Sequence, residues 1–137
     1  MKIDYFSVMP SGPKGALEMH CLTSGNWYRR ISEEWERAVH YGAGVIRIKD
    51  KGAELRIPIE FGLGYVLQYL RQFVAAERQT MDRARQHLQQ QLEWIGNGLP
   101  IRLRRLEDTI ELTADDGHRF PREAFLEAVE QANQTVS

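Results

Sequence analysis

Apolar and polar residues alternate near the start of the chain in the manner of β-strands. Residues 3–8 carry apolar side chains at a period close to two, and residues 16–22 form a second candidate strand. A hairpin is predicted next, with arms at 45–49 and 54–60 around a turn that contains glycine. Pro58 has no amide hydrogen to donate, so its strand is expected to be a sheet edge or to carry a bulge.

Further strands and two helices follow from the same patterns. The segment 27–41 places its apolar residues at helical spacing and its charged residues on the opposite side, which predicts an amphipathic helix. Strands are expected at 101–106 and 109–113, paired with each other. A last helix is predicted from Pro121, a residue suited to a first helical position, to about Asn133.

The segment 65–95 is the most unusual part of the sequence. It has no proline or glycine and is rich in good helix formers, so it is predicted to be one continuous helix about 46 Å long. Its apolar stripe is broad at the start and then narrows to Met81, Ala84 and Leu88. Because a narrow seam is typical of contact with one partner helix, self-association through this helix, as a homodimer, is expected.

Together these elements predict the α+β class. The expected architecture is an antiparallel sheet of short strands packed by helices, with one long central helix. At 137 residues the chain fits a single α+β domain over residues 1–137, since two domains of half this size would have marginal cores.

Charge is distributed unevenly, although the chain as a whole is close to neutral at −1. Residues 62–106 hold seven arginines against three acidic residues, whereas residues 107–137 hold eight acidic residues against two arginines. Two interpretations remain open: the basic and acidic stretches meet in the fold and neutralise each other, or they form separate faces for separate partners.

The arginines of the basic stretch support an alternative function, nucleic-acid binding. Three of them recur at intervals of seven and would line one stripe of the long helix. Arginine binds phosphates and carboxylates alike through its planar fork. The residues predicted for such a site are Arg71, Arg78, Arg85, Arg102, Arg104 and Arg105. The neutral chain and the lack of a nucleic-acid-binding motif weigh against this alternative.

No catalytic, cofactor-binding or metal-binding site is predicted. Gly62-Leu63-Gly64 lacks the third glycine of a dinucleotide-binding turn and the lysine of a phosphate-binding loop, so a tight strand-to-helix turn is expected there. The four histidines have no metal-ligand spacing. Cys21 is the only cysteine and is expected to be a buried small side chain. A small enzyme of unknown chemistry is the second alternative.

A cytoplasmic location without membrane contact is expected. The first residues carry Asp4 and Pro10 and lack the apolar run of a signal peptide. No stretch approaches 18 consecutive apolar residues, and with one cysteine the chain forms no internal disulfide.

The leading functional hypothesis is a non-catalytic protein-binding module, such as an inhibitor, an immunity-type protein, an adaptor or a chaperone-like protein. It follows by exclusion, because no residue pattern indicates chemistry. The partner is another protein, and the predicted contact surface lies on the exposed part of the long helix or at the hairpin edge near Pro58. The helix residues of this surface are Arg78, Met81, Arg85, Leu88 and Gln89.

Overall fold

The computed structural model describes residues 1–11, 16–23, 37 and 39–136. Contacts divide the chain into two compact units. The first unit is Met1–Tyr65 with Gln131–Ser137, and the second is Val66–Glu130. The expectation of a single domain over the whole chain stays a prediction.

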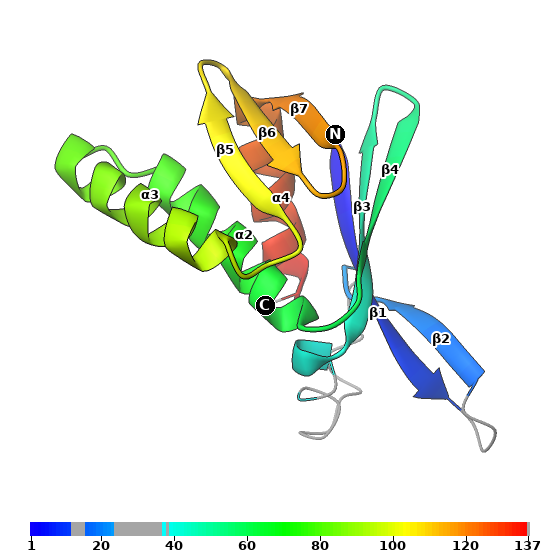
Figure 1. The fold of residues 1–137 in the computed structure, drawn as a ribbon. Helices are drawn as coiled ribbons and strands as arrows, with labels where there is room; N and C mark the ends of the chain where they lie inside the picture. Colours follow the sequence, from blue (N-terminus) through cyan, green and yellow to red (C-terminus); the bar gives the residue numbers. More distant parts are fainter. Residues whose placement is uncertain (12–15, 24–36, 38, 137) are drawn as a thin grey trace. The chain divides into compact units, whose positions relative to one another are not determined.

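The first unit contains a four-stranded antiparallel sheet with the strand order β2-β1-β3-β4 (Figure 1). Its strands are β1 (Lys2–Ser11), β2 (Ala16–Cys21), β3 (Ala43–Asp50) and β4 (Ala53–Ile59). The predicted first strands and hairpin are therefore confirmed.

The turn between β3 and β4 uses Lys51 and Gly52, which have φ angles of 50° and 82°. Glycine tolerates such a positive φ without steric cost, which explains its place here. Pro58 pairs with Val45 in β4, the outer strand of the sheet. The prediction that Pro58 marks a sheet edge is confirmed.

One face of this sheet carries the apolar core of the first unit. Strand pairing aligns Tyr5 with Ile46, and Ile46 with Ile57, and all three are buried. Because side chains alternate across a strand, Ile48 and Ile59, two positions further along, point the same way and are buried as well. The Tyr5 hydroxyl donates a hydrogen bond to Asn133 Oδ1 at 3.2 Å.

The second unit contains a three-stranded antiparallel sheet with the strand order β5-β6-β7. Its strands are β5 (Arg102–Leu106), β6 (Thr109–Thr113) and β7 (Gly117–Pro121). The β5–β6 pair was predicted, but β7 was not, because Asp115-Asp116-Gly117 indicates only a turn. Pro121, expected to open a helix, is instead the last residue of β7 and pairs with Thr109.

The final helix is α4 (Arg122–Val136), which begins in the second unit and ends in the first. The apolar residues at helical spacing within the predicted helix are buried in α4, which confirms an amphipathic helix there. They are Phe125, Ala128, Val129 and Ala132.

The predicted continuous helix over residues 65–95 is interrupted. Two helices of 15 residues each take its place, α2 (Leu63–Glu77) and α3 (Asp82–Gly96), so the prediction of one continuous helix is wrong. No proline or glycine causes the break between them. At the junction, Thr80 N donates to the Gln79 side-chain oxygen instead of continuing the helical ladder.

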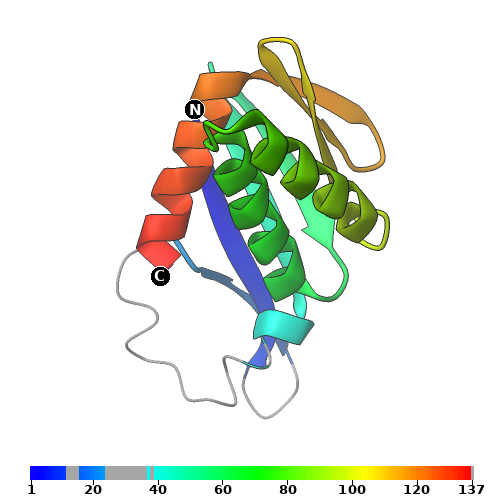
Figure 2. The same ribbon diagram turned by 90° about the vertical axis from the view of Figure 1, so that its left-hand side faces the viewer.

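The reason for the break is tertiary. The two helices form an antiparallel hairpin within the second unit, and both views show them side by side (Figures 1 and 2). Gln89 of α3 bonds Glu77 of α2 at 3.1 Å. At the other end, a Cβ on Gly96 would lie 3.0 Å from the Tyr69 hydroxyl oxygen, so glycine allows α3 to approach α2 closely. Local helix propensity is weak compared with such packing.

The fold class is confirmed as α+β, with antiparallel sheets of short strands packed by helices. The predicted helix 27–41 lies mostly outside the described residues, of which Arg37 and residues 39–41 are helical. None of the helices in the described part of the chain is long and apolar enough to cross a membrane.

Candidate partner-binding surface

Helix α3 exposes large apolar side chains near its C-terminal end. Trp94 has 80% of its surface exposed and Ile95 has 40%. His87, Gln90 and Gln91 precede Trp94 by seven, four and three residues, so helical spacing places them beside it. We call these five residues the α3 outer face. They line a shallow hollow of about 550 Å³.

A second hollow, of about 200 Å³, lies between the two helices of the hairpin. It shares Gln91 and Ile95 with the first hollow, so the two are continuous. None of the residues that line either hollow is an aspartate, glutamate, lysine or arginine. The other lining residues of the second hollow are Gln72, Ala75, Leu88 and Leu92.

This second hollow also shows what the apolar seam of the sequence contacts. Leu92 is buried and Leu88 half-buried, and both line the hollow together with Ala75 of α2. The narrow apolar seam predicted contact with one partner helix. In the structure this helix is α2 of the same chain. Homodimer formation through the helix stays a prediction.

The five predicted contact residues do not share one surface. Met81, which precedes α3, is 67% exposed, and Leu88 is half-buried in the hollow between the helices. Gln89 points inward and donates to Glu77. Arg85 donates to Asp82 one helical turn earlier.

Arg78 is held by acidic residues of α4. Its Nη1 lies 2.8 Å from Glu123 Oε2 and its Nη2 lies 2.7 Å from Glu130 Oε1. The hydrogen bond from Arg78 lowers the pKa of the Glu123 carboxyl below its ordinary value, and these carboxylates in turn raise the pKa of Arg78. Arg78 thus fixes the α2–α3 junction to α4.

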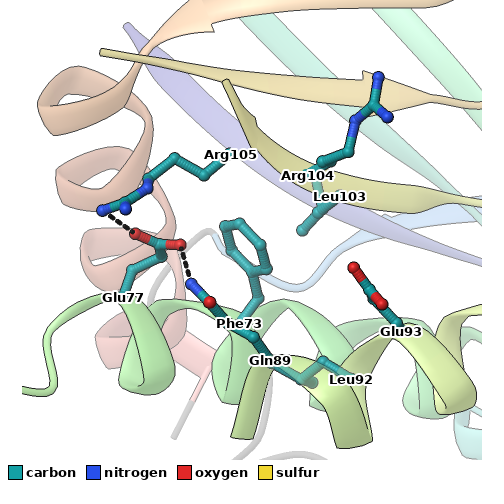
Figure 3. Close-up of a pocket in the computed structure, with 8 residues that line it drawn as sticks. All are labelled: Phe73, Glu77, Gln89, Leu92, Glu93, Leu103, Arg104 and Arg105. Atoms are coloured by element: carbon teal, nitrogen blue, oxygen red, sulfur yellow. Dashed lines mark hydrogen bonds and ion pairs between the residues drawn. The ribbon is translucent and has the colours of Figure 1, made fainter. Parts of the chain in front are cut away.

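Next to it, the Glu77 carboxylate is the centre of a buried polar cluster (Figure 3). Its side chain is 1% exposed, and Arg122 Nε lies 3.1 Å from Oε2 while Arg105 Nη1 lies 3.6 Å away. Gln89 donates to its other oxygen, and Arg122 Nη2 donates to the Glu77 backbone carbonyl at 2.9 Å. A buried carboxylate needs such compensation, and here the partners come from β5, α3 and α4.

The predicted arginine stripe is not formed. Arg71 lies on α2, Arg78 in the junction and Arg85 on α3, so the reversal of the chain at the junction separates them. On β5, Arg104 donates to Glu111 at 3.0 Å, as the predicted cross-strand pairing suggested, and Arg105 contacts Glu77. Arg102 is exposed. Much of the basic stretch is thus neutralised by acidic residues within the fold.

A groove follows β5 where this edge strand faces the hairpin. Two hollows, of about 180 and 240 Å³, share Glu93, Leu103 and Arg104 and are therefore continuous. The Leu103 amide donates to the Tyr69 hydroxyl at 3.0 Å. Burial raises the pKa of the Tyr69 hydroxyl above its ordinary value, and nearby Glu93 adds to the rise while Arg102 opposes it.

The residues considered for catalysis are not assembled into a catalytic arrangement in the part of the chain that the structure describes. His20 and Cys21 are consecutive in β2, so their side chains point to opposite faces. Cys21 is half-buried rather than buried, and its Sγ lies 3.4 Å from the Thr23 hydroxyl, which donates to Asp4 at 2.6 Å. Among the described residues no group of His, Cys, Asp and Glu could hold a metal ion.

The glycine-containing turn before α2 serves packing. Gly62 has a φ of 75°, which favours glycine, and a Cβ on Gly64 would collide with the His40 ring. This agrees with the predicted strand-to-helix turn.

No protein family, characterised protein or solved structure matches this chain. The functional argument therefore depends on the residues themselves. Sequence reasoning missed Trp94, because it followed the apolar stripe of Met81, Ala84 and Leu88, and Trp94 does not continue that stripe. The sequence did hold a signal for its exposure. Trp94 stands next to Gln and Glu residues and does not belong to the apolar stripe that a packed helix buries.

Proposed function

We propose that this protein is a non-catalytic protein-binding module and that its partner contacts the α3 outer face. Inhibitors, immunity-type proteins, adaptors and chaperone-like proteins all act through such contacts. A cytoplasmic location is part of the proposal.

The observation that carries the proposal is the exposure of Trp94. A tryptophan side chain is large and mostly apolar, and leaving 80% of it in water forgoes the stabilisation that burial would bring. Ile95 extends this apolar area, and the glutamines beside it provide a polar rim. Protein interfaces combine an apolar centre rich in aromatic residues with a polar rim, and tryptophan is frequent among their energetically dominant residues.

The state of the arginines favours a protein partner over a nucleic acid. Arg78, Arg104 and Arg105 contact carboxylates of their own unit. A phosphate backbone would have to compete with these carboxylates for the same guanidinium groups. Nucleic-acid binding gains its affinity from cations that are available to phosphates and release their counterions.

The proposal is tested by comparing Trp94→Ala with Arg119→Gln, an exposed substitution on β7 away from α3. Each immobilised variant and the wild type are used to recover proteins from source cells. The protein enriched by the wild type is then purified and titrated by calorimetry. We expect Arg119→Gln to bind like the wild type and Trp94→Ala to bind about 30-fold more weakly, as for a dominant interface residue.

Equal affinity of the two variants would contradict the α3 outer face as the contact site. A separate measurement addresses the alternative function. Fluorescence anisotropy with labelled DNA and RNA at about 50 mM salt should show no binding; binding that weakens steeply with salt would favour a nucleic-acid partner instead.

A further inference from the structure

The larger hollow of the β5 groove has the size and the donors of a small-ligand site. Its volume is about 240 Å³. A water molecule occupies about 30 Å³ in the liquid, so the hollow offers the space of about eight waters, which suits a molecule of several heavy atoms. Its lining residues are Tyr69, Glu93, Arg102, Leu103, Arg104, Glu111 and Thr113, all in the second unit.

The charged residues in this hollow fall into two groups. Arg104 donates to Glu111 at 3.0 Å, and Arg119 Nε lies 3.6 Å from the same carboxylate, so Arg104 and Glu111 already satisfy each other. Arg102 and Glu93 are exposed, and neither forms an ion pair with a residue that the structure describes. One guanidinium and one carboxylate are therefore left to bind a ligand.

Tyr69 lines the same hollow as these two charged residues. Tyr69 is 2% exposed, and its oxygen accepts the Leu103 amide hydrogen. Its own hydroxyl hydrogen has no acceptor among the described residues. Both Arg102 and Glu93 are close enough to influence its ionisation. A buried hydroxyl with an unused hydrogen strongly favours an acceptor such as a carboxylate.

Larger ligands fit this place less well. Helix α3 contacts β5 directly, so an additional strand, which needs about 4.8 Å beside the edge, has no room between them. A nucleic-acid strand that continued along the sheet would meet Glu107 and Asp108 at one end and Asp115 and Asp116 at the other. The hollow is suited to a molecule that stays within it.

We propose that the β5 groove binds a small zwitterion, a molecule with one carboxylate and one ammonium group. The carboxylate accepts hydrogen bonds from Arg102 and from the Tyr69 hydroxyl. The ammonium group pairs with Glu93. A simple anion would meet Glu93 as a like charge, and a simple cation would meet Arg102, so a ligand that carries both charges is favoured over either alone. This site is independent of the partner surface on α3.

The test uses the whole ¹⁵N-labelled protein and NMR titrations. The probes are glycine, β-alanine and 4-aminobutanoate, which separate the two charges progressively, with acetate and methylammonium as single-charge controls. The signals followed are the Leu103 amide, which reports on Tyr69, and the Arg102 Nε–H. We expect one of the zwitterions to saturate both signals and to bind at least about tenfold more tightly than acetate or methylammonium.

Three variants separate binding from a general change in structure. Arg102→Gln and Glu93→Gln each remove one exposed charge and should weaken zwitterion binding about tenfold or more. Arg119→Gln removes an arginine from the same sheet outside the hollow and should leave binding unchanged. The proposal is overturned if no zwitterion gives a saturable shift up to about 50 mM, or if acetate binds as well.

One further result would overturn it. If Glu93→Gln shifts the Arg102 Nε–H signal in the absence of any probe and no zwitterion binds the wild type, Arg102 and Glu93 pair with each other and the site is closed. The α3 outer face keeps its own test in either case.

Discussion

Helices α2 and α3 have equal length and come from one uninterrupted helical pattern, yet they are buried very differently. Helix α2 buries seven apolar residues and the Glu77 carboxylate. Helix α3 buries only Leu92 and Gly96 and leaves Trp94 exposed. The seven apolar residues of α2 are Leu63, Val66, Tyr69, Leu70, Phe73, Val74 and Ala76.

The difference follows from the width of the apolar stripe. A broad stripe lets a helix pack against several elements at once, whereas a narrow one provides only a single line of contact. Helix α3 uses that line against α2, and most of its other side chains are exposed or only half-buried. Since large side chains in water contribute little to folding, Trp94 is expected to add little to the stability of the protein.

The largest expected difference between the two helices is the change in stability when one aromatic side chain of each is shortened to alanine. Phe73→Ala in α2 should lower the free energy of unfolding by about 3–5 kcal/mol, because Phe73 is 4% exposed and its loss leaves a cavity. Trp94→Ala in α3 should change it by less than about 0.5 kcal/mol. Urea unfolding followed by circular dichroism measures both. A cost above about 2 kcal/mol for Trp94→Ala would show that α3 is packed and would remove the basis of the proposed surface.

A smaller effect is expected where the two helices meet the rest of the unit. Glu77→Gln keeps the shape of the side chain but leaves Arg122 and Arg105 without their buried counter-charge. We expect the free energy of unfolding to fall by about 3 kcal/mol.

The matched control is Glu130→Gln, which removes a 41% exposed partner of Arg78. It should cost less than about 1 kcal/mol, because water screens such a pair. Equal costs for the two substitutions would mean that burial of Glu77 is not what joins α2 to β5 and α4.

The smallest effect concerns pH and the Arg78–Glu123 contact at the junction. The pKa of the Glu123 carboxyl is lowered in the folded state, so the contact contributes stability above the carboxyl's ordinary pKa of 4.5, and this contribution is lost as the pH falls through the lower folded value. The Glu123→Gln variant lacks this contribution. Its free energy of unfolding should therefore fall slightly less than that of the wild type as the pH is lowered from 4.5. Chemical-shift titration of the Glu123 side chain checks the direction; a folded pKa above 4.5 would contradict it.

Much of the fold could be predicted from the sequence because its cause is local. Apolar and polar patterning located the strands of both sheets except β7, the proline at position 58 indicated an edge, and the apolar face of α4 was correctly identified. Strand β7 was missed because its five residues follow a turn signal and end in Pro121, which is equally suited to a helix start.

The candidate site was predicted less well, because its members depend on how the helices fold together. Arg78 was expected on an exposed stripe, but its guanidinium is taken by two carboxylates that lie far along the chain. Trp94 was not singled out, since its exposure depends on which side of α3 faces α2.

The sequence by itself determined where most of the helices and strands form, because alternation and helical spacing act between residues a few positions apart. Only the tertiary structure decided that the helical stretch 65–95 breaks after Glu77 and folds back on itself. The physical reason is that a break costs little helix propensity, whereas contacts between residues distant in the chain, such as Glu77 with Arg122, are gained only when α2 ends there.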